Sequence, residues 1–248
     1  MGEQMPRTVY FFATCLVDMF YPNAGLAGMA LIKREGLKVI YPRNQTCCGQ
    51  PAYNAGYRDE ARKVAAAQLD LFPGNHPIVV PSGSCAGMMK HHYPDLFFGK
   101  PEHAKAVDVA DRVWELTGFL TDVLNIKLKD LGEPLRVALH TSCSTRREMG
   151  MAHAGESLLA QLDAVEVVEQ THKAECCGFG GSFAVKQPEI SSAMVRDKTE
   201  ALRATEASLV VSQDSGCLMN IGGAIEHQGE GPKTQHIAEF LWERTRER

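Results

Sequence analysis

The sequence lacks any run of about 18 apolar residues, which is the length that a membrane-spanning helix needs, so we expect no transmembrane segment. Its polar N-terminus, Met1–Arg7, has neither the apolar stretch nor the small-residue cleavage site of a signal peptide. Pro6 stands where a myristoylation signal beginning at Gly2 would have Ser or Thr. From these absences we expect a cytoplasmic protein.

Charge of one sign is also scarce, because 26 Lys and Arg against 30 Asp and Glu leave a net charge of −4. This balance gives no electrostatic reason to expect a nucleic acid or an anionic membrane as partner. Patterns for binding flavin, nicotinamide or molybdenum are missing as well. The glycines of Gly178–Gly181 do not fit Gly-x-Gly-x-x-Gly, and no expected strand directly precedes them.

What the sequence does have is eight cysteines in two sets of four. Each set is a single cysteine, an adjacent pair followed by glycine, and a last single cysteine. The sets are Cys15, Cys47, Cys48 and Cys85, and Cys143, Cys176, Cys177 and Cys217. Corresponding cysteines are offset by 128, 129, 129 and 132 residues, which indicates an internal duplication. Inside a cell, where thiols stay reduced, such clusters indicate metal or redox chemistry rather than disulfides.

The segments between the cysteines repeat as well. Expected strands are Thr8–Ala13, Lys38–Tyr41 and Pro77–Val80 in the first copy, and Arg136–His140, Val165–Val168 and Ser208–Ser212 in the second. Expected helices are Asn23–Gly36, Arg58–Leu71 and Asp111–Leu124, and then Ala154–Leu162, Ile190–Thr205 and His236–Arg244. The alternation predicts an α/β fold of two tandem Rossmann-like domains, residues 1–128 and 133–248, related by a pseudo-two-fold and joined through Asn125–Pro134.

Ligands of open parallel sheets bind beyond the carboxyl ends of the strands. Each cysteine, or cysteine pair, follows a predicted strand at that end, so we expect the four cysteines of a copy to meet. Gly49 and Gly178–Gly181 would let the backbone come close to a bulky cluster and point amide hydrogens at its sulfur. A helix beginning after each pair would favour thiolate over thiol.

On these residues the sequence resembles the CCG, or cysteine-rich, domain family. This family includes the cysteine-rich subunit of heterodisulfide reductase and the iron–sulfur subunits of glycolate oxidase and anaerobic glycerol-3-phosphate dehydrogenase. Its pattern is a single cysteine, a Cys-Cys pair and a final Cys-x-x-Cys. The gaps here are 31 and 36 residues in the first copy and 32 and 39 in the second. Met88 and Asn220 replace the last cysteine of the two final motifs.

All eight cysteines are used by the two motifs, and the sequence has no ferredoxin-like Cys-x-x-Cys-x-x-Cys run. It is therefore most similar to the lactate utilization protein A group of the family. This resemblance implies an iron–sulfur electron-transfer subunit of a multi-protein complex that oxidises L-lactate to pyruvate. It also implies companion subunits, one of them with ferredoxin-type clusters, without which this oxidoreductase subunit is inactive.

The resemblance further implies that all eight cysteines bind iron–sulfur clusters, one or two per chain. Four thiolates per copy favour a four-iron four-sulfur cluster over the five-cysteine, double-cubane-like cluster of heterodisulfide reductase. Zinc in one of the two sites stays open as an alternative, since four thiolates also suit tetrahedral zinc. The sequence assigns no catalytic residue.

Two other functions remain open at this point. The chain could be a self-sufficient thiol–disulfide or heterodisulfide-type reductase, because adjacent cysteines can form a redox-active pair. It could also be a non-catalytic, metal-stabilised scaffold subunit. Beyond the cysteines, His140 at a strand end near Cys143 is a site candidate or a core histidine, and Arg146 and Arg147 could hold a carboxylate or face solvent.

Overall fold

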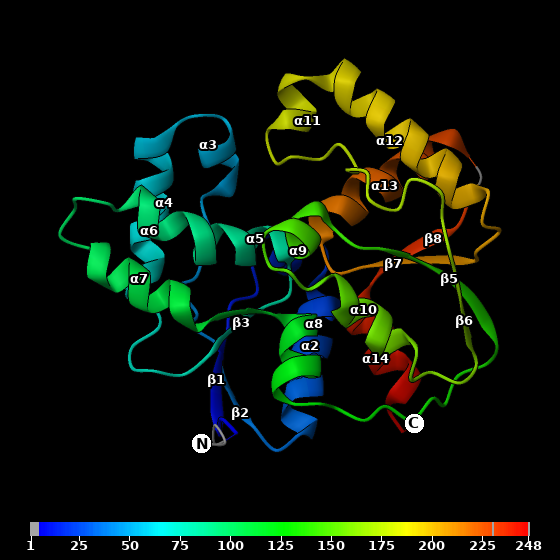
Figure 1. Cartoon of the computed structure of the whole chain (residues 1–248), viewed down its shortest axis with the longest axis horizontal. Helices are drawn as coiled ribbons and strands as arrows, with labels where there is room; N and C mark the ends of the chain where they lie inside the picture. The colour runs from blue at the N-terminus through cyan, green and yellow to red at the C-terminus, as the bar shows by residue number, and fades with distance from the viewer. Residues whose placement is uncertain (1–4, 230, 248) are drawn as a thin grey trace.

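The computed structural model describes residues 5–229 and 231–247, so the start of the polar N-terminus, Met1–Gln4, lies outside the described residues. The chain forms two four-stranded parallel sheets, with strand orders β2-β1-β3-β4 and β6-β5-β7-β8 (Figure 1). The same order in both sheets confirms the predicted duplicated α/β fold. The strands are β1 (Thr8–Phe11), β2 (Lys38–Ile40), β3 (Ile78–Val80), β4 (Val113–Glu115), β5 (Leu135–His140), β6 (Val165–Val168), β7 (Leu209–Ser212) and β8 (Lys233–His236).

Helices connect the strands and cover both faces of each sheet. Those of the first copy are α1 (Cys15–Phe20), α2 (Pro22–Arg34), α3 (Gln50–Asn54), α4 (Arg58–Leu69), α5 (Gly83–Gly87), η1 (Met88–His92), α6 (Tyr93–Leu96), α7 (His103–Arg112), α8 (Leu116–Gly118) and η2 (Phe119–Val123). Those of the second are α9 (Cys143–Arg147), α10 (Ala152–Leu159), α11 (Phe183–Lys186), α12 (Pro188–Arg203), α13 (Ser215–Gln228) and α14 (Ile237–Thr245). Within the described ranges, no helix is long and apolar enough to cross a membrane.

The prediction of one closing helix over Asp111–Leu124 was wrong. α7 ends at Arg112, and the next three residues form strand β4, which pairs with β3 from Ile78 opposite Val113 onward. The helical spacing of the apolar residues misled the prediction because β4 is too short to show an alternating pattern. The second copy has the same fourth strand, β8, whose polar sequence Lys-Thr-Gln-His carries no strand signal.

The core lies in three parts because each sheet is buried on both faces, which explains the unbroken apolar character of its central strands. Along β1, Val9 and Phe11 face a central core, whereas Tyr10 faces a core on the outer side. Helices α2, α8, α10 and α14 fill the space between the two sheets (Figure 1). This central core contains side chains from both copies, including Leu31 of α2 and Leu241 of α14.

Two helix contacts at the centre show the pseudo-two-fold relation. α2 packs against α14, and α10 packs against α8 and η2. α2 and α10 lie between the first and second strands of their copies, whereas α8 and α14 follow the fourth strands. The two contacts are therefore the same contact with the copies exchanged.

The segment Asn125–Pro134 joins the copies without helix or strand, and it is fastened at its middle. Arg244 donates from Nε to Asp130 Oδ1 at 2.8 Å and from Nη2 to Oδ2 at 2.6 Å, a buried bidentate pair. The ion pair between Asp130 and Arg244 thus holds this segment against α14. The division into residues 1–128 and 133–248 as domains stays a prediction.

Candidate functional site

The first four cysteines meet at the carboxyl edge of the first sheet. Cys15 begins α1 directly after β1, and Cys85 lies in α5 after β3, the neighbouring strand. The chain leaves β1 and β3 toward opposite sides of the sheet, and this topological switch point is where α/β proteins bind ligands. The pair Cys47 and Cys48 reaches the same place from the loop between β2 and α3. A cavity of about 230 Å³ is lined by all four.

The second copy repeats the arrangement. Cys143 begins α9 after β5, and Cys217 lies in the first turn of α13 after β7. With Cys176 and Cys177 they line a second cavity, of about 80 Å³. All eight cysteines are free thiols. The structure therefore brings together each of the two sets of four that the sequence pattern singled out.

Within each cavity the thiols follow one another in a row from outside to inside, and each thiol shifts the pKa of its neighbour. In the first copy the row is Cys15, Cys47, Cys48 and Cys85. In the second it is Cys143, Cys176, Cys177 and Cys217. The first two members of each row are half-buried and the last two are buried. A group held by such a row would be enclosed at one end and accessible at the other.

The glycine after each cysteine pair has a specific structural role. Gly49 and Gly178 have φ values of +90° and +84°, a left-handed conformation that other residues adopt at a cost. This conformation points the Gly49 amide at Cys47 Sγ, 3.4 Å away, and the Gly178 amide at Cys176 Sγ, also 3.4 Å away. Hydrogen bonds from the Cys15 and Cys48 thiols, with that from Gly49, lower the pKa of Cys47 to about 3. The thiolate is the form that binds metals.

The two cavities adjoin. Gln50, Ser84, Phe179 and Gly181 line both of them. Across the boundary between the copies, Ser182 Oγ donates to the carbonyl oxygen of Pro51 at 3.1 Å. α5 and α9 lie side by side at the centre of the molecule, with α3 and α11 above them in Figure 1. The two sites are thus neighbours related by the pseudo-two-fold.

A buried carboxylate, Asp214, links the starts of two cysteine-bearing helices, α5 and α13, and sequence reasoning missed it. Its Oδ1 accepts hydrogen bonds from the amides of Gly216 (3.1 Å) and Cys217 (3.4 Å) at the start of α13. Its Oδ2 accepts from the Ser84 amide (2.8 Å) and the Ser82 hydroxyl (3.1 Å) at the start of α5. An Asp two residues after the expected strand Ser208–Ser212 and three before a cysteine was the available signal for a helix start, since Asp is a favoured N-cap.

The cavities differ behind their buried cysteines. His140 is the last residue of β5. One of its ring nitrogens and the sulfurs of Cys177 and Cys217 all lie within 4.8 Å of one another. In the part of the chain that the structure describes, neither ring nitrogen of His140 has a hydrogen-bond partner. Burial, together with the nearby Lys198 and Arg146 charges, lowers the pKa of His140 to about 3. Its imidazole is therefore neutral, as a metal ligand must be.

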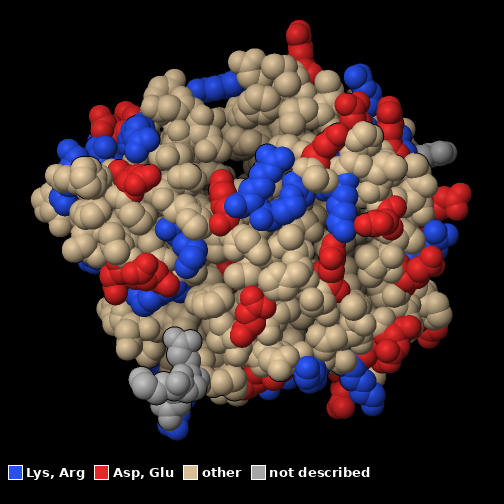
Figure 2. Space-filling view, viewed as in Figure 1, with Lys and Arg blue, Asp and Glu red and all other residues tan. Residues whose placement is uncertain are grey.

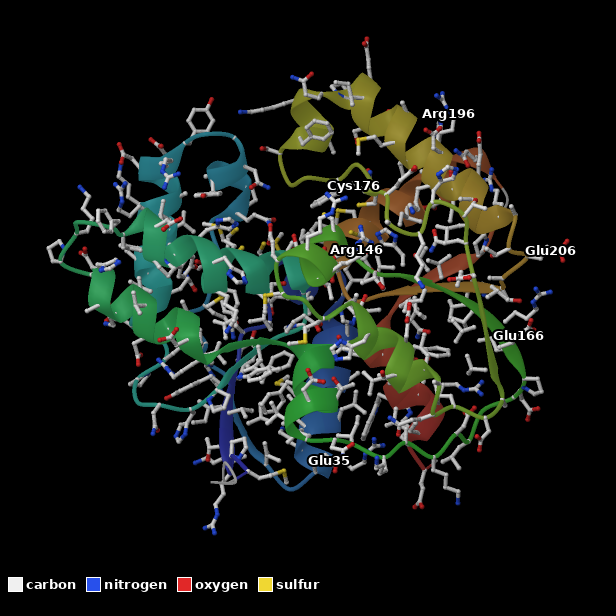
Figure 3. All side chains as sticks on the ribbon, viewed as in Figure 1. Glu35, Arg146, Glu166, Cys176, Arg196 and Glu206 are labelled. Carbon is white, nitrogen blue, oxygen red and sulfur yellow. The ribbon has the colours of Figure 1, made fainter. Side chains whose placement is uncertain are left out.

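Basic side chains also gather around the second site. Lys198 is buried, and its Nζ donates to Gln170 Oε1 at 3.3 Å and to the His172 carbonyl oxygen at 2.6 Å. Figure 3 shows Arg146 beside Cys176, and Figure 2 shows blue side chains gathered over α9. Arg146 donates to the Ala174 carbonyl oxygen, and at 3.3 Å to that of Lys173, so it holds the loop that leads to the cysteine pair.

Met88 and Asn220, which replace the last cysteine of the family pattern, are both occupied elsewhere. Met88 is wholly buried in the outer core of the first sheet and does not line the cavity. Asn220 Nδ2 donates to the carbonyl oxygen of Cys177 at 2.7 Å, so it fixes the backbone of the pair. The cavities thus offer four thiols each to a bound group, and in the second copy the His140 imidazole lies next to two of these thiols, Cys177 and Cys217.

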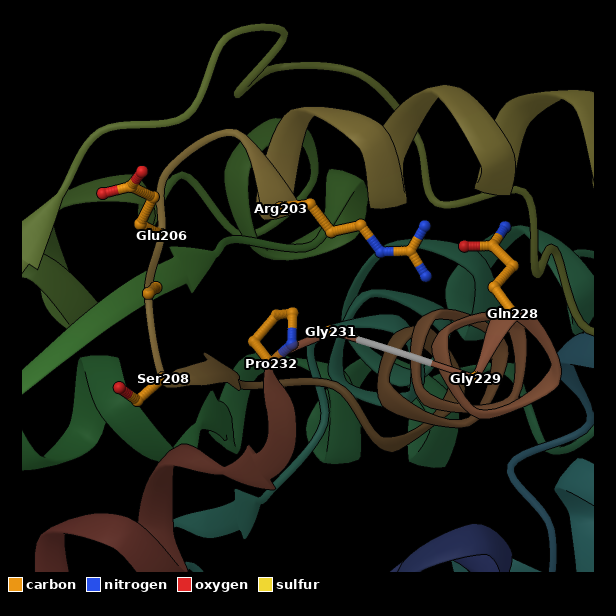
Figure 4. Close-up of a pocket in the computed structure, with 8 residues that line it drawn as sticks. Arg203, Glu206, Ser208, Gln228, Gly229, Gly231 and Pro232 are labelled. Carbon is orange, nitrogen blue, oxygen red and sulfur yellow. The ribbon is translucent and has the colours of Figure 1, made fainter.

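The larger hollow in Figure 4, about 710 Å³, lies elsewhere. It opens at the amino ends of β7 and β8, the edge of the sheet opposite the cysteines. Its lining includes Arg203, Glu206, Ser208 and Gln228, and Figure 4 shows the Arg203 side chain extending toward Gln228. The convergence of thiols, and not the size of a hollow, therefore identifies the candidate site.

The donor set fits a metal or a metal–sulfur cluster bound through thiolates, because it combines four sulfurs per cavity, glycine amides directed at sulfur and a buried imidazole to which no described residue bonds. A family model for the cysteine-rich domain, CCG, matches residues 9–90 and 137–222. The chain belongs to this family of cysteine-rich domain proteins, with two copies of the domain.

Individual relatives point to one group within it. The chain is 45% identical to lactate utilization protein A of Geobacillus sp. (strain WCH70), over 94% of this chain and 98% of that protein. It is 42% identical to lactate utilization protein A 2 of Bacillus cereus (strain Q1), over 94% and 97%. In fold it is similar to a hypothetical protein from Helicobacter pylori, at a TM-score of 0.67 and 10% identity, covering 99% of this chain and 50% of that one. The chain thus spans half the length of that protein.

Proposed function

We propose that this protein is an iron–sulfur electron-transfer subunit of a multi-protein complex that oxidises L-lactate to pyruvate in the cytoplasm. The observation that carries the proposal is the pair of adjoining cavities, each lined by four thiols. It occurs on a chain that matches proteins named lactate utilization protein A over nearly their whole length.

In this proposal all eight cysteines are ligands and each chain holds one or two four-iron four-sulfur clusters, zinc being the alternative in one site. A bound iron–sulfur cluster supplies one-electron transfer. The buried cysteines, Cys48 and Cys85 or Cys177 and Cys217, hold its inner side away from water. The amides of Gly49 and Gly178 donate to sulfur and so favour the negatively charged form of the ligands.

The proposal includes companion subunits, one of them with ferredoxin-type clusters. Oxidising lactate removes two electrons and two protons, which calls for a base near the hydroxyl group and a two-electron acceptor. Cofactors such as flavins normally take up such a hydride equivalent, and this sequence carries no binding pattern for them. The half-buried cysteines at the outer end of each row suit electron exchange with a partner.

A self-sufficient thiol–disulfide reductase is the second candidate. The low pKa of Cys47, about 3, favours it, because hydrogen bonds from neighbouring thiols make this half-buried sulfur a thiolate. Such an enzyme would use its own cysteines and cluster to pass two electrons from a reductant to a disulfide substrate, without companion subunits.

The test is anaerobic purification followed by iron, sulfide and zinc analysis. Cys48→Ser and Cys177→Ser are each expected to lower the metal content of one site only. Val167→Ser, at an exposed position of β6, is the control and keeps both sites. Unchanged iron in both cysteine variants would overturn the ligand assignment.

Activity separates the two candidates. L-lactate oxidation, measured with a dye acceptor, is expected only when the companion subunits are added. It is expected to disappear when Cys143, Cys176 or Cys177 is replaced. Disulfide reduction by the isolated, cluster-loaded chain, supplied with a chemical reductant, would instead support the second candidate.

A further inference from the structure

We propose that His140, which lies beside Cys177 and Cys217 at the buried end of the second row of thiols, is a ligand of the metal centre there, so that one site of this chain binds through thiolates alone and the other through thiolates and an imidazole. The inference rests on the proposed function, because it requires a metal centre in the cysteine cavities. It amends the ligand set of the second site, since a four-iron four-sulfur cluster has four ligand positions and His140 would take one of them in place of one of the four thiolates. It assigns a residue that the repeated cysteine pattern does not contain.

The first argument is the state of the side chain. His140 is 1% exposed, and both of its ring nitrogens are buried without a hydrogen-bond partner among the described residues. Buried polar atoms in folded proteins nearly always have a partner, so an unpartnered imidazole indicates a missing one. The charged groups that act on it are Lys198 and Arg146, both cations, so no carboxylate pairs with it as an ion.

The second argument is position. One nitrogen of His140 and the sulfurs of Cys177 and Cys217 lie within 4.8 Å of one another, and all three residues are buried. The three donors come from three separate segments: the end of β5, the loop before α11, and the first turn of α13. Convergence of soft and borderline donors from separate segments on one point is what a bound metal ion requires.

The third argument is the comparison that the duplication provides. Phe12 occupies the corresponding place, three residues before Cys15 as His140 is three residues before Cys143. The Phe12 ring is wholly buried and lies edge-on to Phe72, with ring centroids 6.0 Å apart. An apolar side chain therefore suffices where the position only fills the core. In the second copy the corresponding residue is an imidazole, and it lies beside two buried thiols, Cys177 and Cys217.

A second difference between the copies is also expected to raise the reduction potential of the centre in the second cavity. Lys198 is buried near the second site, where the first copy has the uncharged Gln68, bonded to Thr46. An imidazole ligand carries no negative charge, and histidine ligation raises the reduction potential of iron–sulfur centres. The centre in the second cavity is therefore expected to have the more positive reduction potential of the two.

Pulsed EPR on the reduced, iron-loaded full chain tests the assignment, with histidine labelled by ¹⁵N. The expected result is a nitrogen coupling of ligand strength in the native protein. His140→Phe, which copies Phe12, and His140→Cys, which offers a sulfur instead, are both expected to abolish it. Lys198→Gln copies Gln68, removes a charge but no ligand, and is expected to retain the coupling.

A redox titration of the same samples gives a second measurement. The His140→Cys variant is expected to lower only the more positive of the two potentials, and this variant serves if His140→Phe does not fold. Cluster signals without nitrogen coupling in the native chain would overturn the inference and leave the proposed function standing. A native chain without any cluster signal would overturn both.

Discussion

Ser82 donates its hydroxyl hydrogen to Oδ2 of Asp214 across 3.1 Å, and these two residues are counterparts in the two copies. Ser82 is the N-cap of α5 and Asp214 the N-cap of α13, and each precedes a cysteine, Cys85 or Cys217, by three residues. The pseudo-two-fold passes between them. The two candidate metal sites therefore share one hydrogen-bonded junction.

Replacing Asp214 with Ala is expected to lower the free energy of unfolding by about 3 to 5 kcal/mol, since it leaves buried donors of two helices without their charged acceptor. Ser82→Ala removes one of the four hydrogen bonds and is expected to cost about 1 kcal/mol. Urea denaturation measures both. Equal, small losses in the two variants would show that Asp214 does not join the two helix starts.

The close approach of α5 and α9 depends on Gly83. A Cβ atom at this position would lie 1.9 Å from Thr145 Oγ1 and 2.9 Å from Ser142 Oγ, both in the second copy. Gly83→Ala is therefore expected to push the helices apart, destabilise the fold by about 1 to 3 kcal/mol and reduce metal uptake in both cavities.

Gly223 provides the matched control, because it lies exposed within α13 and a Cβ there meets nothing within 4 Å. Gly223→Ala is expected to stabilise the protein by about 0.5 to 1 kcal/mol through its helix propensity. Thermal unfolding followed by circular dichroism distinguishes the two. If the two alanines have the same effect, the contact between α5 and α9 is not tight.

The third prediction concerns how the ionisation of Glu115 makes the stability of the fold depend on pH. This carboxyl group is 1% exposed, and its Oε2 caps α8 by accepting from the amides of Thr117 (2.9 Å) and Gly118 (3.2 Å). Burial raises its pKa from 4.5 to about 7. Between these pH values the unfolded chain loses the proton before the folded protein does. Its contribution to stability is thus complete below pH 4.5 and lost as pH rises through 7.

Glu115→Gln keeps an acceptor for the helix amides and removes the ionisation. At pH 8 it is expected to be more stable than the native protein by up to about 3 kcal/mol, and the difference is expected to vanish near pH 4. Glu133→Gln, at an exposed position in the connecting segment, is the control and should leave the pH dependence unchanged. Denaturation midpoints across this pH range measure the effect, and a constant difference would contradict the assignment.

The shared central core leads to the fourth prediction. Phe11 and Leu31 of the first copy pack in the same cluster as Leu139, Leu158 and Leu241 of the second. Expressed alone, residues 1–128 and 133–248 would each expose one side of this core, so we expect aggregation or loss of cooperative unfolding. Expressed together they are expected to associate into one complex on size exclusion. A half that is monomeric and unfolds cooperatively by itself would show that the copies are independent domains.

Much of this site could be predicted from the order of residues because the fold is a repeat. The offsets of 128 to 132 residues between corresponding cysteines indicated the duplication, and the strands before Cys15 and Cys143 indicated where the thiols would emerge. Such features are local, since an apolar run forms a buried strand and a parallel sheet brings the residues after its strands to one edge.

The fourth strands could not be predicted from the sequence because an edge strand needs little pattern of its own. All four residues of β8 are polar, and they form a strand because their backbone pairs with that of β7. The edge strand β4 of the first copy is only three residues long, so the spacing of Val113 and Leu116 fitted a helix as well as a strand.

The order of residues was enough to specify two sets of four cysteines, an α/β duplication and a glycine after each cysteine pair. The packing of the folded chain established that the two cavities adjoin and that Asp214 bonds to the helix starts beside both. It also established that His140 lies beside Cys177 and Cys217 without a hydrogen-bond partner among the residues that the structure describes. These are contacts between residues far apart in the chain. Their presence depends on how α2, α8, α10 and α14 pack between the two sheets, and no local pattern specifies that packing.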